Sequence, residues 1–323
     1  MKKFTFENKN VLITGGAGFV GSNLIRFLIK EKPGHIIVVD NFFLGKRENI
    51  EPLKEEFSSL EILEHDARDY DFMAAQMEKF NIDIVYNLAT ETLLHSFDNP
   101  ESTFLVNVEL GAVLLKLLCQ KKFKTLIHFS SSEVYGSKEK GKINEGHYFG
   151  AKTPYAAGKA ATDLMIRSYL NIFPDLDIAI VRPFNMYGPF QNEGLYAGVV
   201  PITIKRILQN QPPIQEGSGR QSRDFIFVED ASLAALEIYK NPKAHFREIN
   251  IAGGKEIKIK DLISAICKEL GYKGKIILKP QRKGDVMRHC ADISLAKKLI
   301  GFKPRTNLSL GLKKTVDYYK SIL

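Results

Sequence analysis

A glycine-rich stretch near the start of the chain restricts its fold more than any other feature. Residues Val11–Gly21 read VLITGGAGFVG, in which a short apolar run leads into glycines and a helical pattern, Phe19–Lys30, follows at once. Gly15, Gly18 and Gly21 recur at every third position. In a strand–turn–helix unit the first such glycine forms the tight turn, the second lets a pyrophosphate approach the backbone, and the third packs the helix on the sheet. The helix N-terminus adds unpaired N–H groups for the phosphates, so the stretch predicts a dinucleotide site.

An acidic residue at the end of the next apolar run supports this prediction. Asp40 closes the run His35–Asp40 about 20 residues beyond the glycines, where a dinucleotide-binding unit places a carboxylate on the adenosine ribose. Because a carboxylate accepts from a free 2′-hydroxyl and repels a 2′-phosphate, we expect NAD rather than NADP. Lys46 and Arg47 offer charges that a 2′-phosphate could bind, but we expect them in a solvated loop. The alternative is a purely structural glycine turn in another α/β protein.

The first half of the chain alternates short apolar runs with helical patterns. The runs are rich in Val, Ile and Leu and lack a clean two-residue alternation, as expected for parallel strands covered on both faces. We therefore predict an α/β fold of the Rossmann type, a doubly wound parallel sheet with helices on both sides. The expected strands are Asn10–Thr14, Ile36–Asp40, Leu60–Glu64, Ile82–Leu88, Thr125–Phe129 and Asp177–Val181, and the clearest helices are Pro100–Gln120 and Pro154–Ile172.

From Arg182 onward this alternation stops, because prolines interrupt the chain at positions 183, 189, 201, 212 and 213. We expect residues 1–181 to form an NAD-binding Rossmann domain and residues 182–323 to form mainly a smaller α/β domain that covers a substrate. The two are expected to be partly interleaved, with a segment at about 222–245 returning to the first domain. A final amphipathic helix is predicted at Leu308–Tyr319.

Composition excludes several classes of protein. The net charge of +9 is spread along the 323 residues without a clustered basic stripe, so no nucleic-acid partner is expected. Cys119, Cys267 and Cys290 have no metal-ligand spacing and are odd in number, so neither a metal site nor a disulfide framework is predicted. No apolar run approaches the ~18 residues of a membrane span, and the N-terminus lacks the apolar core of a signal peptide. We expect a cytoplasmic protein without a membrane partner.

A tyrosine four residues before a lysine places both side chains on one helix face. The ammonium can then lower the pKa of the phenol and prepare it to accept a hydroxyl proton. The pattern occurs at Tyr148/Lys152, Tyr155/Lys159 and Tyr239/Lys243. Glycine interrupts the first copy and proline the third, whereas Tyr155 and Lys159 follow a plausible N-cap, Thr153, and a proline suited to the first helical position. We predict that Tyr155 is a catalytic base supported by Lys159; the alternative is a surface pair.

The other half of the catalytic site is expected where the strand Thr125–Phe129 ends. Residues Ser130–Glu133, sequence SSSE, follow it at the carboxyl edge where ligands bind in such sheets. Hydroxyls there can orient a substrate hydroxyl toward Tyr155, and the carboxylate can move a second proton. A serine cluster after a strand can otherwise be only a turn or a helix N-cap.

Two further strand ends carry polar or small residues. Asp66 follows the third expected strand and can either accept from an adenine amino group or cap the next helix. Asn87–Thr90 ends the fourth expected strand, where small side chains let the backbone approach a ribose.

The chain resembles an extended short-chain dehydrogenase/reductase of the nucleotide-sugar epimerase/dehydratase family. The similarity spans almost the whole chain in the family's order. The matching segments are Thr14–Gly21 (TGGAGFVG), Asp40-Asn41, Ser130–Gly136 (SSSEVYG), Tyr155/Lys159, Arg182–Pro189 (RPFNMYGP), Gly217–Ala231 and Gly284–Lys303. The resemblance implies that NAD takes a hydride from C4 of a hexose, with Tyr155 as the base and Lys159 on the nicotinamide ribose.

The same resemblance implies which residues surround the ligands. The adenosine ribose is expected at Asp40 and Asn41, and the adenine at Asp66 and Ala67. Further cofactor contacts are expected from Gly15, Gly18, Phe19, Val20, Leu88, Ala89, Ser130 and Phe184, and substrate contacts from Thr90, Asn185, Arg223 and Arg288. Arginine suits a nucleotide diphosphate because its guanidinium fork binds two oxygens at once. The partner is expected to be a UDP-, GDP- or dTDP-linked sugar, and the two long helices match those that pair relatives into homo-oligomers.

The triplet Ser131-Ser132-Glu133 bears on the reaction. In thymidine-diphosphate-glucose 4,6-dehydratases it is Thr-Asp-Glu, whose Asp protonates the C6 hydroxyl and whose Glu removes the C5 proton. Here glutamate is retained and serine occupies the acid position, similar to GDP-mannose 4,6-dehydratases and UDP-glucuronate decarboxylases, whereas 4-epimerases commonly lack the glutamate. We predict a 4,6-dehydratase that uses Glu133. A 4-epimerase or C4-dehydrogenase and then a decarboxylase are the alternatives, and the segment Gly284–Arg288 resembles epimerases more than decarboxylases. A non-enzymatic dinucleotide sensor is not favoured.

Overall fold

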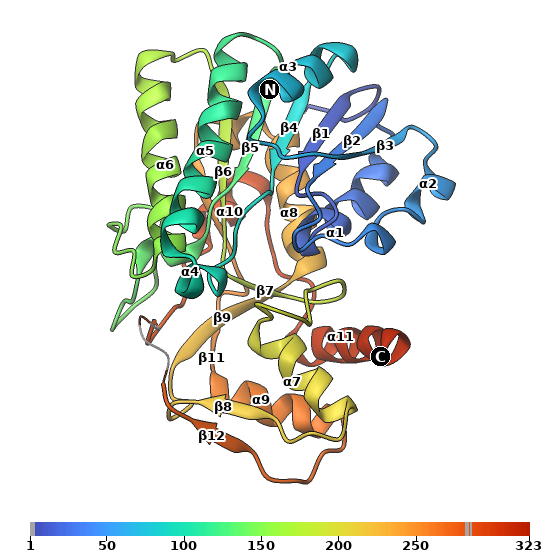
Figure 1. Ribbon diagram of the computed structural model, residues 1–323. Coiled ribbons are helices and arrows are strands. Elements are labelled where there is room, and N and C mark those ends of the chain that lie inside the picture. The colour runs from blue at the N-terminus through green and yellow to red at the C-terminus, as the bar shows by residue number, and fades with distance from the viewer. Residues whose placement is uncertain (1–3, 282–283, 285) are drawn as a thin grey trace.

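The computed structural model describes residues 4–281, 284 and 286–323, which form two lobes (Figure 1). The larger lobe is built on a parallel sheet of seven strands in the order β10-β6-β5-β4-β1-β2-β3. From β1 the chain extends the sheet first in one direction and then in the other, which confirms the predicted doubly wound Rossmann-type fold. The strands are β1 (Asn10–Thr14), β2 (His35–Asp40), β3 (Leu60–Glu64), β4 (Ile84–Asn87), β5 (Thr125–Phe129), β6 (Asp177–Pro183) and β10 (Glu248–Ile251).

Helices cover both faces of this sheet. One face carries α1 (Phe19–Leu28), α8 (Val228–Lys240) and α10 (Ser294–Ile300), and the other carries α3 (Tyr70–Lys79), α5 (Pro100–Cys119) and α6 (Pro154–Ile172). Consecutive residues of β1 divide between the two cores, since Val11 and Ile13 pack with the first group of helices and Leu12 packs with the second. All three side chains are fully buried. The strands therefore carry continuous apolar runs instead of alternating polarity.

The predicted element boundaries lie close to the observed ones. β1, β3, β5 and α6 have the expected bounds, whereas the fourth strand is Ile84–Asn87 rather than Ile82–Leu88. α1 ends two residues early because the chain tightens into a 3₁₀ turn, Ile29–Glu31, and then reverses at Lys32 with φ 56°. Short elements that the sequence did not predict include α2 (Leu53–Glu56), α4 (His95–Asp98) and the further 3₁₀ turns Arg47–Asn49, Ser132–Tyr135 and Pro242–Ala244.

Helix α5 corrects one expectation. It has 20 residues and its most apolar window has a mean hydropathy of 1.6, so by length and composition alone it could cross a membrane. The expectation that no apolar run approaches this length was therefore wrong. Leu114, Leu115 and Leu118 of α5 pack into the core beneath the sheet, and α6 runs alongside (Figure 1). In this structure α5 is a core helix of the larger lobe.

The smaller lobe combines two small sheets with three helices (Figure 1). The elements are β7 (Asn185–Tyr187), β9 (Ser222–Phe227) and β11 (Glu256–Lys258) in one sheet, β8 (Ile214–Glu216) and β12 (Ile277–Lys279) in the other, and α7 (Val199–Leu208), α9 (Ile259–Glu269) and α11 (Leu308–Ile322). Within the expected return segment at 222–245, β9 belongs to the smaller lobe, whereas α8 packs on α1 of the larger lobe. The domain boundary itself remains a prediction.

A buried ion pair joins α6 to the sheet. The guanidinium of Arg182 on β6 is fully buried, and its Nε and Nη2 lie 2.9 and 2.8 Å from Oδ2 of Asp163 on α6. Glu248 on β10 lies 2.9 Å from Nη2, and Nη1 donates to the hydroxyl of Tyr135 at 2.9 Å. Because a charge buried here depends on its partners for solvation, the cluster holds α6 in one position against the sheet.

We expect Arg182→Met to lower the free energy of unfolding by about 3–5 kcal/mol, because Asp163 would remain as an uncompensated buried charge. Urea denaturation measures this loss. Lys314→Met is the control, since it breaks a partly exposed ion pair with Glu229 and should cost less than about 1 kcal/mol. Equal losses in the two variants would show that the buried pair does not stabilise the fold as argued.

Candidate active site

The turn between β1 and α1 contains three glycines, and an added Cβ would have a different consequence at each of them. Gly15 has φ +68°, and a Cβ there would lie 2.7 Å from the backbone nitrogen of Ala89, just after β4. A Cβ on Gly21 would lie 2.5 Å from the carbonyl oxygen of Gly15, so only glycine lets α1 begin this close to the turn. A Cβ on Gly18 would meet one atom of the described chain within 4 Å, that same oxygen at 3.3 Å. Because Gly18 has no Cβ, the backbone at this position stays accessible to a ligand.

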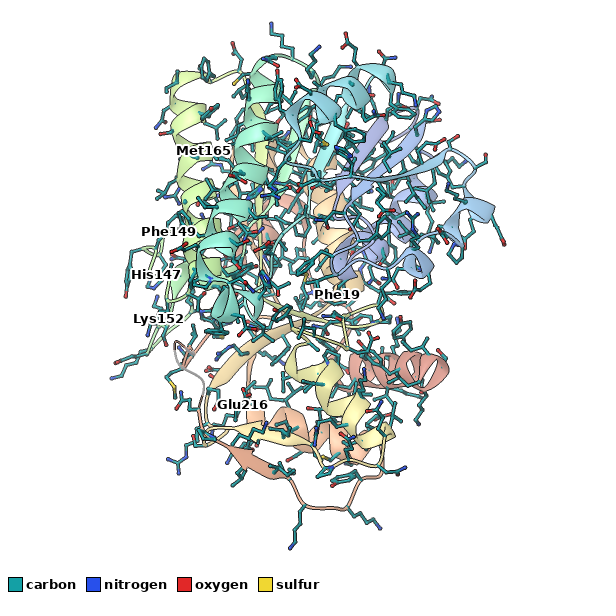
Figure 2. The ribbon with its side chains drawn as sticks, viewed as in Figure 1. Phe19, His147, Phe149, Lys152, Met165 and Glu216 are labelled. Atoms are coloured by element: carbon teal, nitrogen blue, oxygen red, sulfur yellow. The ribbon has the colours of Figure 1, made fainter. Side chains whose placement is uncertain are left out.

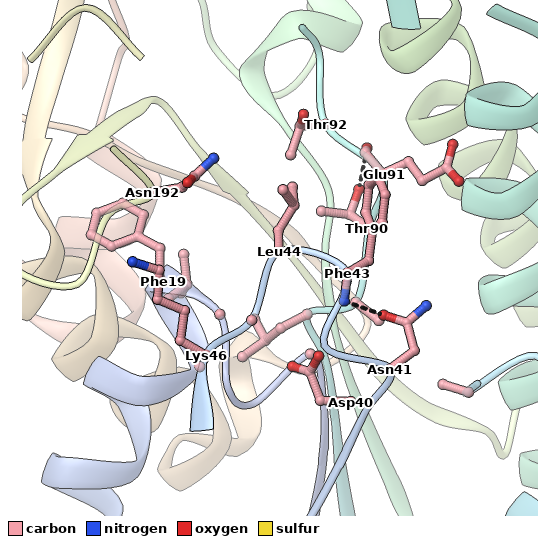
Figure 3. Close-up of a pocket in the computed structure, with 18 of the residues that line it drawn as sticks. Phe19, Asp40, Asn41, Phe43, Leu44, Lys46, Thr90, Glu91, Thr92 and Asn192 are labelled. Carbon is pink, nitrogen blue, oxygen red and sulfur yellow. Dashed lines mark hydrogen bonds between the residues drawn. The ribbon is translucent and has the colours of Figure 1, made fainter. Parts of the chain in front are cut away.

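A first cavity of about 370 Å³ opens at the carboxyl ends of β1 to β4 (Figure 3). The glycine turn and the ends of these strands form its wall, and the loop 190–198 of the smaller lobe closes it from the other side. The predicted site residues that line it are Gly15, Gly18, Phe19, Val20, Asp40, Asn41, Asp66, Ala67, Leu88, Ala89 and Thr90. The fold thus brings together residues that the sequence placed in four separate segments.

Asp40 points its carboxylate into a set of backbone donors at the edge of this cavity. Its two oxygens accept hydrogen bonds from the backbone N–H of Ala17 and of Phe42, each at 2.9 Å. The side chain is buried, and this burial raises the pKa of the carboxyl group above its usual value. The side chain of Asn41 accepts from the backbone N–H of Phe43 at 3.1 Å (Figure 3). Both side chains are therefore held in fixed orientations beside the first cavity.

Asp66 also lines the first cavity, but it does not cap the following helix. The N-cap of α3 is Asp69, whose carboxylate accepts from the backbone N–H of Phe72 at 3.0 Å. Asp66 instead binds the guanidinium of Arg68, with Oδ2 2.7 Å from Nη2, and this bond lowers the pKa of Asp66. Of the two interpretations of Asp66, the helix cap is wrong, and the contact with adenine remains a prediction.

The rim of the first cavity contains a contact between the lobes that the sequence did not reveal. Nζ of Lys46, after β2, lies 2.6 Å from Oε1 of Glu193 in the loop 190–198. In the same loop the ring of Tyr196 meets the ring of His95 edge-on, with 4.9 Å between the centroids. Arg47 lies on the exposed surface as expected, whereas Lys46 lines the cavity. Two loops far apart in sequence therefore meet across the mouth of the cavity.

A second cavity of about 320 Å³ adjoins the first, and Phe19, Val20, Leu88 and Thr90 line both. It lies between the end of β5, the start of α6 and the link from β6 to β7. The predicted site residues that line it are Ser130, Ser131, Ser132, Glu133, Tyr155, Lys159, Phe184 and Asn185. The serine cluster and the tyrosine–lysine pair, predicted separately, therefore face one space.

The start of α6 directs Tyr155 and Lys159 into the second cavity. Oγ1 of Thr153 accepts from the backbone N–H of Ala156 at 3.2 Å, and Pro154 is the first helical residue, as predicted. The other two copies of the pattern have no such arrangement. Tyr148 lies in a loop and is 69% exposed, and the end of α8 separates Tyr239 from its lysine.

The pKa values of Tyr155 and Lys159 differ from the expectation. Nζ of Lys159 donates to the carbonyl oxygen of Phe129 at 3.0 Å, and burial lowers the pKa of Lys159 to about 8, against the raising effect of Asp163. Burial raises the pKa of Tyr155 to about 12, which a hydrogen bond with Ser131 opposes and the charge of Glu133 reinforces. The expected lowering of the phenol pKa by Lys159 is absent in this structure, and desolvation of the phenolate has the largest effect.

Of the two roles that the sequence left open for the serine cluster, the structure shows the cap, and the orientation of a substrate hydroxyl remains a prediction. Oγ of Ser131 accepts from the backbone N–H of Glu133 at 3.2 Å and caps the 3₁₀ turn Ser132–Tyr135, so the cap interpretation holds for this residue. Ser130 donates to Asp163 at 2.8 Å, which links the end of β5 to α6. The sequence analysis missed Asp163, although its place four residues after Lys159 on one helix face was a usable signal.

A third cavity of about 390 Å³ continues from the second into the smaller lobe, sharing Glu133 and Asn185 with it. Arg223 on β9 and Glu216 on β8 line it, and Figure 2 shows Glu216 in the smaller lobe, well away from Phe19 between the lobes. Arg288 is not among the residues that line these three cavities.

The guanidinium of Arg288 instead binds Glu256 at 2.8 Å and donates to the carbonyl oxygen of Gly141 at 2.6 Å. Its predicted contact with the substrate would therefore require a rearrangement of this side chain. Asp285, in the same predicted motif, lies outside the described residues. Within the described chain no group of three or more His, Cys, Asp or Glu side chains is arranged to hold a metal ion.

Comparisons with known proteins agree on the family. The family model for GDP-mannose 4,6 dehydratase matches residues 12–315. A putative UDP-glucose 4-epimerase from Methanocaldococcus jannaschii is 34% identical over 320 residues, covering 96% of this chain and 98% of the relative. UDP-glucuronic acid decarboxylase 1 from Xenopus tropicalis is 30% identical, covering 98% and 73%. Among solved structures, the dTDP-glucose 4,6-dehydratase DesIV from Streptomyces venezuelae, crystallised with NAD, superposes with a TM-score of 0.91 at 26% identity and covers 97% of each chain.

The chain therefore belongs to the NAD-dependent nucleotide-sugar epimerases and dehydratases of the extended short-chain dehydrogenase/reductase family. This confirms the family that the sequence motifs indicated. The relatives differ in the reaction that their names give, so membership of the family does not by itself select one reaction.

We expect Gly15→Ala and Gly18→Ala to differ sharply in stability. The first forces a Cβ against the backbone of Ala89 at a positive φ and should lower the free energy of unfolding by about 2 kcal/mol or more, whereas the second should cost less than about 1 kcal/mol. Urea denaturation of both variants measures the difference. Similar losses would contradict the distinct roles given to the two glycines.

Proposed function

We propose that this chain is an NAD-dependent enzyme that oxidises the hexose of a nucleotide sugar at C4 and then acts on the 4-keto sugar as a 4,6-dehydratase. The observation that carries this proposal is the position of Glu133. It shares the second cavity with Tyr155, Lys159 and Ser131, and it is the one carboxylate among the described residues lining that cavity. A single oxidation and return of hydride needs no such carboxylate, whereas removal of a C5 proton does.

The residues around the first cavity fit NAD. Gly18, as N-cap of α1, leaves the first N–H groups of the helix without a side-chain cap, and a pyrophosphate can approach there because Gly18 has no Cβ. The carboxylate of Asp40 retains acceptor capacity for ribose hydroxyls beyond its two backbone bonds. When bound, NAD would take a hydride from the sugar and later return it. Tyr155, Lys159, Ser130 and the other predicted cofactor residues would hold it across the two joined cavities.

Tyr155 would take the proton of the C4 hydroxyl, with Ser131 as its hydrogen-bond partner. Its raised pKa means that the phenol is protonated at neutral pH in this structure, so the base must form only when ligands change the electrostatics of the cavity. Lys159 is the group able to supply positive charge, since its ammonium forms below a pKa of about 8 and is fixed to the carbonyl of Phe129. The two side chains therefore act as one unit.

Glu133 would remove the C5 proton once C4 is a ketone, because the carbonyl makes that proton acidic. No carboxylate stands at the acid position, which Ser132 occupies, so the proton that Glu133 collects is the one available for the hydroxyl that leaves C6. The hydroxyl of Ser132 can hydrogen-bond the leaving oxygen but cannot supply a net proton. Glu133 is thus assigned both proton transfers.

A 4-epimerase or C4-dehydrogenase is the second candidate, because the M. jannaschii relative is a putative UDP-glucose 4-epimerase. A UDP-glucuronate decarboxylase is the third, supported by the X. tropicalis relative. Both share the oxidation at C4 with a dehydratase and differ from it only in the fate of the 4-keto sugar. An NADH-releasing dehydrogenase would consume the cofactor stoichiometrically, which absorbance at the NADH band detects.

The substrate is proposed to be a UDP-, GDP- or dTDP-linked hexose. Asn185 and Arg223 line the third cavity, where the diphosphate would lie, and Thr90 would border the sugar. We further propose a cytoplasmic homo-oligomer without nucleic-acid or membrane partners. Exposed Leu105 on α5 and Leu164 on α6 provide apolar area for pairing these helices between copies.

We expect Tyr155→Phe and Glu133→Gln to stop the reaction at different steps. With a panel of nucleotide hexoses, Tyr155→Phe should slow reduction of the cofactor by about 100-fold or more, because the base is lost. Glu133→Gln should retain this reduction and fail to form a dehydrated product, as mass spectrometry would show. Cofactor reduction at the wild-type rate in Tyr155→Phe would refute the assignment of the base. Undiminished net turnover in Glu133→Gln would refute the dehydratase mechanism.

We expect the wild-type protein to bind NAD about tenfold or more tightly than NADP, because the carboxylate of Asp40 repels a 2′-phosphate. Asp40→Asn keeps the size and an acceptor oxygen but removes the charge, so it should reduce this preference. Isothermal titration with both dinucleotides measures the two ratios. Preference for NADP in the wild-type protein would contradict the proposed role of Asp40.

A further inference from the structure

His289 approaches Glu133 from outside the cavities. Its side chain is fully buried, its ring meets the ring of Phe184 edge-on at 5.8 Å between centroids, and its backbone N–H donates to the carbonyl of Ser222 at 3.1 Å. It is not among the residues that line the three cavities. Nδ1 of its ring nevertheless lies 3.8 Å from Oε1 of Glu133. A histidine thus stands directly behind the carboxylate to which the proposed function gives the proton transfers.

The hydrogen bond that Nε2 of His289 makes determines which ring nitrogen carries the proton. Nε2 of His289 bonds the carbonyl oxygen of Gly136, and a carbonyl can only accept, so Nε2 carries the hydrogen. Burial and the nearby charge of Arg223 lower the pKa of His289 to about 3, so the ring is neutral near pH 7. Nδ1 is then a bare acceptor that faces Glu133.

Nδ1 has no hydrogen-bond partner within the part of the chain that the structure describes. Two acceptors, a ring nitrogen and a carboxylate oxygen, cannot bond each other, which accounts for their separation of 3.8 Å. A proton on Oε1 changes this, because the O–H can then donate to Nδ1 at an ordinary hydrogen-bond length of about 2.7 Å. To form this hydrogen bond, Oε1 and Nδ1 must approach each other by about 1 Å.

We infer that His289 is a positioning residue that stabilises the protonated form of Glu133, an inference that rests on the proposed function. As the C5–H bond breaks, the proton passes to Oε1 and the electron pair forms the C5=C6 bond while the C6–O bond breaks. The O–H of Glu133 donates to Nδ1 until the proton joins the departing hydroxyl, which leaves as water. His289 itself gains no proton and touches no reacting atom.

Other titratable or charged side chains lie in the same cavity linings as Glu133, so a test must isolate His289. The titratable or charged side chains that share a cavity lining with Glu133 are Tyr155, Lys159, Glu216, Arg223 and Lys279. Substituting these side chains would disturb the cavity itself. His289 reaches Glu133 from behind and is not among the residues that line the three cavities, so a change there leaves the lining residues in place.

Two substitutions of His289 separate its role as a hydrogen-bond acceptor for Glu133 from its structural hydrogen bond to Gly136. The side-chain amide of His289→Gln can replace Nε2 as donor to Gly136 but leaves no acceptor at Nδ1. The side-chain oxygen of His289→Asn replaces Nδ1 but gives up the bond to Gly136. His245→Gln is the control for stability, since His245 is also buried and bonded to a backbone carbonyl, that of Tyr239.

The first experiment measures two steps in the same full-length protein with NAD and a nucleotide hexose that it oxidises, in deuterated water. Absorbance of bound NADH reports oxidation at C4, and mass spectrometry reports exchange of the C5 proton. We expect His289→Gln to slow exchange at C5 by about tenfold or more and to leave C4 oxidation unchanged. This slowing is part of the roughly 100- to 10,000-fold acceleration that a positioned acid or base supplies. His289→Asn should exchange within about threefold of the wild-type rate, well inside one order of magnitude. Equal slowing of both steps in His289→Gln, or slower exchange in His289→Asn than in His289→Gln, would overturn the inference.

The second experiment does not depend on turnover. Infrared difference spectra across a pH titration, assigned with Glu133→Gln, give the pKa of Glu133 in the wild-type protein and both His289 variants. We expect this pKa to fall in His289→Gln and to stay near the wild-type value in His289→Asn, and an unchanged pKa in His289→Gln would overturn the inference. If the wild-type protein oxidises C4 without any exchange at C5, the dehydratase function fails, while a fall in the pKa of Glu133 would still support the contact with His289.

Discussion

The catalytic arrangement depends on the buried carboxylate of Asp163. It binds Arg182 of β6 and accepts from Ser130 at the end of β5, so it connects α6 to two adjacent strands of the sheet. Tyr155 and Lys159 lie on the same helix, two turns and one turn before Asp163. The distance between the tyrosine–lysine pair and the serine cluster is therefore set by an ion pair whose two side chains line none of the three cavities. Such a pair is costly to bury, and its use here is to give α6 a single position.

Desolvation is the second physical factor that governs the site. It raises the pKa of Tyr155 to about 12 and lowers that of Lys159 to about 8, so near neutral pH the phenol keeps its proton while Lys159 remains mostly an ammonium. The same effect keeps His289 neutral behind Glu133. The phenol of Tyr155 therefore holds its proton until a bound substrate changes the electrostatics of the cavity, so the base forms only when substrate is present.

The fold and most of the candidate site were predictable because their signals are local. The turn at Gly15 requires a positive φ, and the spacing of Tyr155 and Lys159 on a capped helix is a property of contiguous residues. The carboxyl ends of parallel strands meet at one edge, so the order of strands was enough to bring Asp40, Leu88 and Ser130 to one face. The helix-cap interpretation of Asp66 failed because Asp69, three residues on, offers the same side chain at the helix start itself.

The amino-acid sequence by itself determined the glycine turn, the alternation of strands and helices, the family and the residues that gather at the carboxyl edge of the sheet. These depend on backbone conformations and on spacings of a few residues. The tertiary structure decided the contact of Lys46 with Glu193, the pairing of Arg288 with Glu256 and the approach of His289 to Glu133. It also decided the direction of the pKa shift at Tyr155. These depend on how distant loops close and on how completely water is excluded, and neither is a property of any contiguous stretch of the chain.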